Sequence, residues 1–363
     1  MVQPAPRLII DLAAIQRNYA RLKAMAPGAR VGAVVKANAY GLGALQVLPA
    51  LADAGCRTFY VAHTAEGREA REALAGRPAE IFVFNGFWAT DLAALREAEL
   101  FPVINDLHQL HQLRELAPDL PCAIHFDTGM NRLGLGPNAT RTLIDNPDWL
   151  AGLDVRQILS HLACSHEAAH PLNARQLERF TRIREKFPGV PASFANSGGA
   201  MLGPSYHFDI LRPGLALYGG PPSDGVANPF EATVRVEAPV LQVRTIAAGD
   251  CAGYGAIFTA GHEMRIATVA TGYADGLLRA CGDGGFGRIN GVKTPIIGRI
   301  SMDLTTVDLS AVTAPVEPGD RVSFLGADVG AMADAAQTIT YEFLVRLGQR
   351  FQRVYEPASG TAE

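Results

Sequence analysis

The stretch Val31-Gly-Ala-Val-Val-Lys36-Ala-Asn-Ala-Tyr40-Gly-Leu-Gly43 decides how the rest of the chain is interpreted. Its first half is a short valine-rich run, which predicts a buried strand. Lys36 ends that run, and a glycine-punctuated turn then leads into 44–54, whose apolar spacing predicts a helix. In parallel α/β folds, ligands bind at the carboxyl ends of the strands. A lysine there is a candidate nucleophilic amine, able to form a Schiff base with a carbonyl cofactor, and the simpler alternative is a surface lysine just past a strand end.

Strand-like and helix-like segments alternate from residue 11 to residue 225. Eight short apolar runs predict strands at 31–35, 58–62, 81–84, 102–105, 122–126, 155–160, 192–195 and 209–211. The segments between them, such as 89–99, 106–116 and 173–187, have apolar residues three and four apart and predict helices. Eight such repeats over about 215 residues favour a (β/α)8 TIM barrel over an open doubly wound sheet, which spacing alone leaves possible.

The pattern changes near residue 225, after the turn-rich segment 219–225. Short runs at 234–236, 240–246, 263–267 and 322–324 predict strands, and 339–347 predicts a helix. Asn290-Gly291, between the runs 286–289 and 292–297, predicts a hairpin because both turn residues must accept positive φ. We therefore expect an α/β protein with a (β/α)8 barrel over 8–228 and a mostly β C-terminal domain over 229–363. Whether a strand within 1–10 joins the second domain is open.

Composition narrows the class of protein. The 363 residues suggest two domains, and shares of 48% hydrophobic and 19% charged residues are typical of globular proteins. A net charge of −4 provides no basic surface for nucleic acid or acidic membranes. Residues 1–7 are too short and proline-rich for a signal peptide, and no apolar run approaches the ~20 residues of a membrane helix. Five scattered cysteines without a CxxC pair favour reduced thiols in the cytoplasm.

Polar side chains follow several of the predicted strands. Lys36 follows the first strand, Arg132 the fifth, His161 the sixth, Ser197 the seventh and Arg212 the eighth. Because the carboxyl ends of barrel strands share one rim, we expect these groups to converge. Each of them alone would suit an ion pair or a satisfied core position, but five together predict a site.

Two well-known motifs occur in the chain. His166-Glu167-Ala-Ala-His170 satisfies HExxH and supports an alternative of another class, a zinc hydrolase. The motif requires both histidines in one helix, and Pro171 biases His170 away from helical geometry, so we expect loop histidines and no metal. The segment 282–287 satisfies GxGxxG, but it leads into the predicted hairpin instead of opening a helix, so we interpret it as a turn.

The chain also resembles a known family, the bacterial alanine racemases. Segment 33–43 is similar to their pyridoxal-phosphate (PLP) attachment motif. The similarity continues in the family's order through 127–132, 195–197, 212–219, 253–255, 272–276 and 298–303, and so covers nearly the whole chain. The resemblance implies a barrel with PLP, a C-terminal β domain, alanine as substrate, and a head-to-tail homodimer. In that dimer a tyrosine of one subunit reaches the cofactor held by the other.

The resemblance also implies roles for individual residues. Lys36 and Tyr254 would be two bases on opposite faces of the substrate, which together interconvert L-alanine and D-alanine. The remaining residues are His161, Arg212 and Arg132 as supporting groups, Tyr40, Ser197, Arg212, Gly214, Leu215 and Tyr341 for the cofactor, and Arg132, Tyr273 and Met302 for the substrate. A broad-specificity or serine racemase stays an alternative, because the pocket near Tyr273 and Tyr341 sets specificity. Whether the product serves peptidoglycan or is degraded is open.

Other relatives of the same barrel fit less well. A barrel decarboxylase would require a carboxylate where Arg212 is expected, and non-enzymatic cofactor carriers of this fold usually lack a second domain. One position departs from the family pattern. Many members have a lysine, modified to a carbamate, seven residues before the site arginine, and this chain has His125 there. A neutral ring does not supply a carbamate's charge, so we expect an anion such as chloride, or a nearby carboxylate, to orient Arg132.

Overall fold

The computed structural model describes residues 5–282 and 284–357. Packing divides these residues into two compact units. One unit contains residues 15–217 and 221–230, and the other contains residues 5–14, 218–220 and 231–357. The predicted domain boundary after residue 228 stays a prediction, because compactness does not test whether either part folds alone.

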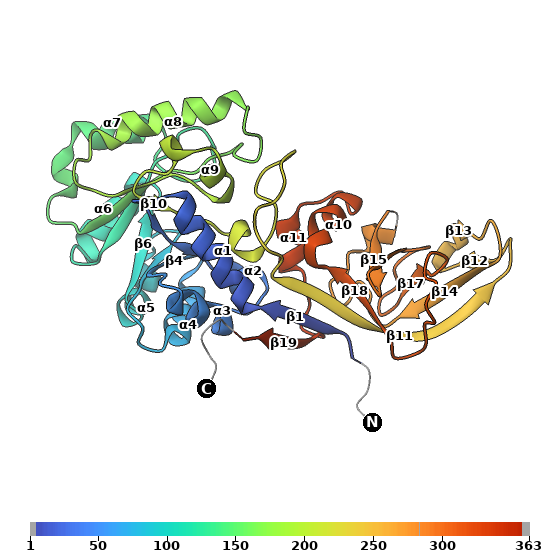
Figure 1. Ribbon diagram of the computed structural model, residues 1–363. Coiled ribbons are helices and arrows are strands. Elements are labelled where there is room, and N and C mark those ends of the chain that lie inside the picture. Colours follow the sequence, from blue (N-terminus) through green and yellow to red (C-terminus); the bar gives the residue numbers. More distant parts are fainter. Residues whose placement is uncertain (1–4, 283, 358–363) are drawn as a thin grey trace. The chain divides into compact units, whose positions relative to one another are not determined.

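The first unit is built on a parallel sheet that closes into a barrel (Figure 1). Its strands are β2 (Arg30–Val31), β3 (Ala33–Val34), β4 (Thr58–Val61), β5 (Glu80–Val83), β6 (Leu100–Ile104), β7 (Cys122–His125), β8 (Val155–Leu159), β9 (Ala192–Ser193) and β10 (Ile210–Leu211). β2 and β3 are two halves of one extended segment, of which the first pairs with β10 and the second with β4. Counting them as one strand gives eight, so the predicted (β/α)8 fold is confirmed.

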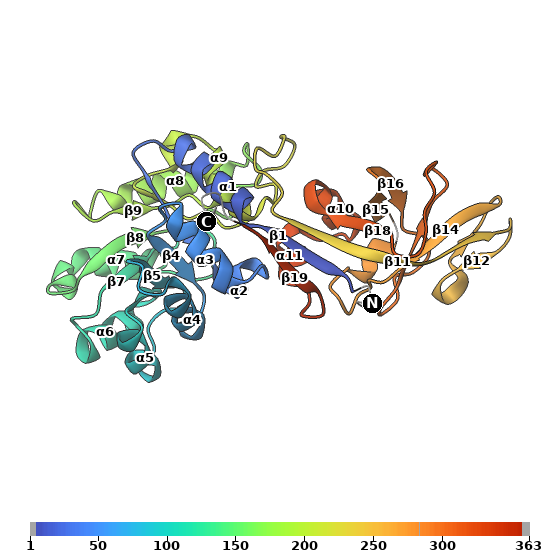
Figure 2. The same cartoon turned by 60° about the horizontal axis from the view of Figure 1, so that its bottom comes forward.

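Helices follow the strands and lie around the outside of the barrel, as Figure 2 shows. They are α1 (Leu12–Met25), α3 (Ala44–Asp53), α4 (Thr64–Leu74), α5 (Leu92–Glu97), α6 (Leu107–Leu116), α7 (Pro137–Asp145), α8 (Pro171–Arg184) and α9 (Ser197–Met201). In α3 the side chains of Val47, Leu48 and Leu51 are fully buried, whereas Leu45 is exposed. This is the pattern that burial of one helix face against the strands predicts.

The barrel interior is filled by large side chains. Tyr60 on β4 is fully buried, stacks on Phe82 with ring centroids 5.4 Å apart, and donates a hydrogen bond to Gln157 Oε1 on β8 at 3.0 Å. Gly32 leaves the space for that ring, since a Cβ there would lie 2.7 Å from Tyr60 Cε2. The interior is therefore a packed core, and ligands are left to the rim.

The second unit is mostly β-structure. Its main sheet has the order β16 (Val292–Pro295), β15 (Phe286–Ile289), β18 (Arg321–Leu325), β11 (Val234–Ile246), β1 (Arg7–Asp11) and β19 (Gln352–Glu356), and β14 (Met264–Val269) pairs with both β11 and β17 (Thr305–Asp308). A small separate ladder joins β12 (Cys251–Ala252) and β13 (Phe258–Thr259). Asn290 and Gly291 have φ of 51° and 80° between β15 and β16, which confirms the predicted hairpin.

Three features of this unit differ from or complete the sequence prediction. The runs 234–236 and 240–246 belong to one strand, β11, which changes partner from β18 to β14 across Pro239 with a register shift at 240–242. β1 lies between β11 and β19, so the N-terminal strand belongs to the second unit. The helix α11 (Thr340–Val345) was predicted, and α10 (Val329–Ala335) was not.

Candidate active site

Lys36 lies at the carboxyl rim of the barrel, at the start of an unusual turn. The segment α2 (Lys36–Tyr40) has left-handed backbone at Ala37, Asn38 and Ala39, with φ of 53–54° and ψ of 48–53°, and Tyr40 has φ of 55°. Left-handed helical geometry costs L-residues ~1–2 kcal/mol each. Strain of this kind persists only where the surroundings hold the chain, and it is concentrated at functional sites.

Two side chains hold this turn. Glu66, in the first turn of α4, accepts hydrogen bonds from the backbone N–H of Ala37 at 2.7 Å and of Ala62 at 2.8 Å. Asn38 Oδ1 accepts from the backbone N–H of Ala44 at 2.7 Å. The first two residues of the strained segment are therefore tied, Ala37 to α4 and Asn38 to the start of α3. Sequence reasoning missed Glu66, because only the fold brings residues 37 and 66 together.

The Lys36 amine is partly buried beside another cation. Burial lowers the pKa of Lys36, the positive charge of Arg132 lowers it further, and Glu66 partly opposes both. A lowered pKa increases the fraction of neutral amine, which is the nucleophilic form. The lowered pKa of Lys36 therefore agrees with the nucleophilic amine that its position at the strand end predicts.

Arg212 is held across three neighbouring strands. It follows β10, is only 3% exposed, and donates to Ser193 Oγ of β9 and to the carbonyl of Ser160 after β8. Burial lowers the pKa of Arg212 to about 10, so it keeps its charge at neutral pH. His161, next to Ser160, has its pKa lowered well below the ordinary value by burial and then by Arg212 and Arg132, so its ring is neutral.

A cradle of hydrogen-bond donors lies where the last barrel strands end. The backbone N–H groups of Gly214 and Ala216 point at Ser197 Oγ, at 3.0 and 3.1 Å. A Cβ on Gly214 would overlap the Tyr40 hydroxyl, so the phenol lies directly against this backbone. Leu215 follows as the first residue of a short 3-10 helix. Hydroxyls and backbone amides at this end of a barrel suit a phosphate.

The structure therefore brings together one group of predicted residues. The positive charge of Arg132 lowers the pKa of Lys36, and the charges of Arg212, Arg132 and Lys36 lower the pKa of His161, so these predicted residues share one region of the rim. The second group, Tyr254, Tyr273, Met302 and Tyr341, belongs to the other unit. Their relation to Lys36 therefore rests on the family resemblance and not on this fold.

The residues of the second group are presented on loops and a helix. Tyr254, between two positive-φ glycines, is 72% exposed. The loops of Tyr273 and Met302 are joined, because the N–H of Tyr273 donates to Ser301 O at 3.1 Å and that of Ala274 to Met302 O at 2.9 Å. Tyr341 lies on α11, and burial raises the pKa of its phenol.

The HExxH segment does not form a zinc site. His166 and Glu167 lie in a loop, and His170 caps α8 by accepting from the N–H of Leu172 at 3.2 Å. Across the described residues, no group of three or more His, Cys, Asp or Glu side chains is placed to hold a metal ion. The zinc hydrolase alternative is therefore not favoured. The GxGxxG segment opens no helix over its described part, since β15 begins at Phe286; Asp283 lies outside the described residues.

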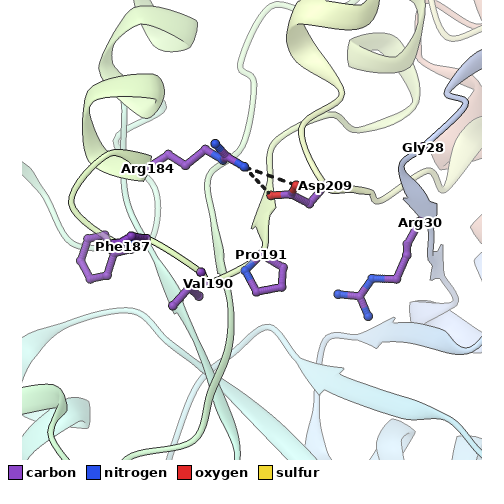
Figure 3. A pocket seen from close by; sticks show the side chains of 9 residues that line it. Gly28, Arg30, Arg184, Phe187, Val190, Pro191 and Asp209 are labelled. Carbon is purple, nitrogen blue, oxygen red and sulfur yellow. Dashed lines mark hydrogen bonds and ion pairs between the residues drawn. The ribbon is translucent and has the colours of Figure 1, made fainter.

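A cavity of about 360 Å³ lies at the opposite end of the barrel strands (Figure 3). Arg30, Pro191 and Asp209 line it, at or just before the starts of β2, β9 and β10. Arg184 is paired with Asp209 across it, at 3.2 Å between Nη2 and Oδ2 (Figure 3). Its position at the amino ends of the strands separates it from Lys36, so it is not the candidate site.

Fold and site together fit one class of enzyme, the TIM barrels that bind a phosphorylated carbonyl compound through a lysine amine. Comparison with known proteins makes this specific. The family described as alanine racemase, N-terminal domain, matches residues 10–222, and that described as alanine racemase, C-terminal domain, matches residues 233–355. The chain belongs to the alanine racemase family.

Individual relatives agree with this assignment. The chain is 42% identical to an alanine racemase of Rhizobium meliloti, with 96% of each chain covered. It is 44% identical to a catabolic alanine racemase of Agrobacterium fabrum, covering 96% of this chain and 91% of the relative. Among solved structures, alanine racemase of Bartonella henselae with covalently bound pyridoxal phosphate has a TM-score of 0.91 at 38% identity, covering 97% of this chain and 99% of that one.

Proposed function

We propose that this protein interconverts L-alanine and D-alanine, with PLP covalently attached to Lys36. The observation that carries the proposal is a lysine of lowered pKa on the same barrel rim as a ready cradle for a phosphate. The relatives are named alanine racemases, which does not favour a serine or broad-specificity enzyme. The relatives' names include a catabolic and a biosynthetic alanine racemase.

The residues present fit PLP. Ser197, Tyr40 and the backbone at Gly214 and Leu215 would hold its phosphate, together with Tyr341. The family resemblance implies that Arg212 would face the pyridine nitrogen. A buried guanidinium with a pKa of about 10 remains a donor, so it would keep that nitrogen unprotonated. When bound, PLP acidifies the α-proton of an amino acid by withdrawing electrons from the α-carbon.

The chain's own residues would then move the proton. Racemisation requires removal of the α-proton on one face and return of a proton on the other, so two bases on opposite sides suffice. Lys36 would serve one face, aided by its lowered pKa. Tyr254 of the partner subunit would serve the other. Arg132 would bind the substrate carboxylate, and the neutral His161 would support Arg212 and Tyr254.

A head-to-tail homodimer would complete this site. On the barrel rim Leu45, Trp88 and Leu133 are exposed, and Tyr254 and Met302 are exposed on the β unit. Exposed apolar side chains on both units of one chain are compatible with the head-to-tail dimer that the family resemblance implies. Tyr273 and Met302 of the partner would then close the site around the substrate.

We place the protein in the cytoplasm because all five cysteines are free. No helix in the described ranges is both long and apolar enough to span a membrane.

Subunit mixing tests the composite site. Lys36→Ala should lose both the yellow absorbance of bound PLP and activity, and Tyr254→Phe should keep the absorbance and lose activity. A heterodimer of the two variants contains one intact site, with Lys36 from one chain and Tyr254 from the other. Random mixing in equal amounts should therefore restore about a quarter of wild-type activity, because half the dimers are mixed and each has one working site of two. No recovery would refute the shared site.

A further inference from the structure

Asn105 and His125 form a pair at the carboxyl ends of neighbouring strands. Asn105 follows β6 and is 3% exposed, and its Oδ1 lies 2.8 Å from Nδ1 of His125, the last residue of β7. The Asn105 amide nitrogen donates to Phe84 O at 2.8 Å and to Val103 O at 2.9 Å. Both amide hydrogens are thus used, so the amide oxygen must face the ring. His125 Nδ1 therefore carries a proton and donates it to Asn105.

This hydrogen bond fixes the tautomer of His125. Burial lowers the pKa of His125 to about 3, with a further decrease from Arg212 and Arg132 and an opposing effect from Asp127. The ring is therefore neutral at physiological pH. A neutral imidazole with its proton on Nδ1 has its lone pair on Nε2, so Nε2 is a hydrogen-bond acceptor.

The loop that carries Arg132 packs on this ring. The backbone N–H of Leu135 donates to His125 O at 2.7 Å, and that of Asp127 donates to Leu135 O at 2.9 Å, so residues 127–135 fold back onto β7. A Cβ on Gly134 would lie 3.0 Å from Cγ and Cδ2 of His125. Asn105 occupies Nδ1, and Gly134 lies against the Cγ–Cδ2 edge of the ring. Among the described residues no hydrogen bond reaches Nε2, which leaves this nitrogen to a further partner. Arg132 is a donor on the same loop, and its positive charge, after that of Arg212, lowers the pKa of the ring.

We propose that His125 is a positioning residue that orients Arg132 through a hydrogen bond accepted by Nε2, and that Asn105 selects the tautomer required for it. The inference rests on the proposed function, in which Arg132 binds the substrate carboxylate. It replaces our expectation that an anion orients Arg132. A neutral acceptor aligns the guanidinium without cancelling its charge, so the charge remains for the substrate.

The test compares His125→Gln with His125→Leu as holoenzymes. Glutamine extends a carbonyl oxygen to about the reach of Nε2 and keeps an acceptor, whereas leucine has a similar volume and none. Loss of one oriented hydrogen bond is expected to raise the KM for alanine about tenfold in His125→Leu, with kcat within about threefold of wild type. His125→Gln should return KM to within about threefold of wild type. Equal KM values for the two variants would overturn the proposal.

Two further measurements use the intact ring. Asn105→Leu leaves His125 in place but removes the acceptor that keeps the proton on Nδ1. The proton can then move to Nε2, which would no longer accept, so KM should rise as in His125→Leu. In ¹⁵N-histidine NMR spectra of the wild-type holoenzyme, the signal absent from His125→Gln should report a protonated Nδ1 and a lone pair on Nε2. A protonated Nε2 would overturn the proposal, and this measurement decides the matter if the leucine variants do not fold.

Replacing chloride by isethionate at constant ionic strength distinguishes an anion from a neutral acceptor. The wild-type KM should not change, and a rise would show that an anion orients Arg132 instead. Wild-type racemisation is measured first. Its absence would refute the proposed function, whereas failure of this inference would leave wild-type turnover intact.

Discussion

Replacing Glu66 by glutamine should loosen the left-handed turn that carries Lys36. The two carboxylate oxygens accept separately from Ala37 N–H at 2.7 Å and Ala62 N–H at 2.8 Å. Glutamine has one acceptor oxygen, so only one of the two backbone N–H groups keeps its hydrogen bond. The other N–H faces the glutamine NH2 group, which is itself a donor. Hydrogen bonds to charged groups contribute ~1.5–3 kcal/mol and neutral ones ~1 kcal/mol. Losing one charged hydrogen bond and making the other neutral, at a partly exposed site, should therefore cost about 2 kcal/mol.

That loss falls on backbone that is already strained. Residues 37–40 have positive φ and none of them is glycine. Asparagine tolerates this region, so the cost falls on Ala37, Ala39 and Tyr40, which at ~1–2 kcal/mol each store ~3–6 kcal/mol that hydrogen bonds must offset. We expect the turn to relax, Lys36 to move from its productive position, and kcat/KM for L-alanine to fall about 30-fold, the equivalent of 2 kcal/mol.

The assay follows the loss of optical rotation of L-alanine at several substrate concentrations. Glu69→Gln is the matched control, because Glu69 is exposed on the same helix and the change removes the same charge. PLP absorbance is measured on both variants to normalise for occupied sites. If Glu66→Gln and Glu69→Gln have the same kcat/KM, the turn does not depend on the carboxylate and the reasoning is refuted.

Further predictions address the cradle, the amine, acid stability and the metal alternative. Gly214→Ala should displace the Tyr40 hydroxyl and weaken PLP binding at least about tenfold, as an absorbance titration would measure, whereas Gly136→Ala, where nothing lies within 4 Å, should not. The rate of PLP attachment to the apoprotein should rise with pH through a midpoint below 10.5, since the pKa of Lys36 is lowered; a midpoint at or above that value would contradict the assignment. His125 takes up no proton in the folded protein until pH approaches 3, but does so near pH 6.5 when unfolded, so the free energy of unfolding should fall as pH drops through this window. His125→Gln should make that slope shallower in urea titrations, by up to ~1.4 kcal/mol per pH unit. Treatment with a chelator should leave activity unchanged, and a metal-reversible loss would restore the zinc alternative.

Much of the barrel could be predicted from the sequence because its strands are buried on both faces. Strands such as β4 and β5 read as continuous apolar runs, and helices such as α6 have three- and four-residue spacing that differs clearly from them. The hairpin at Asn290 and Gly291 could also be predicted, since few residue pairs other than Asn-Gly readily adopt positive φ at both turn positions. These elements depend on local pattern and composition.

The remaining features depend on contacts between distant residues. No local preference predicts a left-handed turn at 37–40, because it is maintained by Glu66 from another βα repeat. The single long strand β11 contains Pro239, and its two halves pair with different strands, so it looked like two elements. The Asn105–His125 pair joins residues 20 apart on neighbouring strands. The roles of Tyr254, Tyr273, Met302 and Tyr341 stay predictions.

The position of β1 between β11 and β19 limits when the main sheet of the second unit can be completed during synthesis. β1 pairs with β11 on one edge and with β19 on the other, although the whole barrel sequence separates it from β11 along the chain. At ~5–20 residues per second, the 345 residues that separate Arg7 from Gln352 take roughly 20–70 seconds to synthesise. While the barrel sequence is being made, β1 has neither neighbour, and after β11 has been made it still lacks β19. Chaperone binding to β1 during this interval would therefore protect a strand whose second edge stays unpaired until β19 has been made.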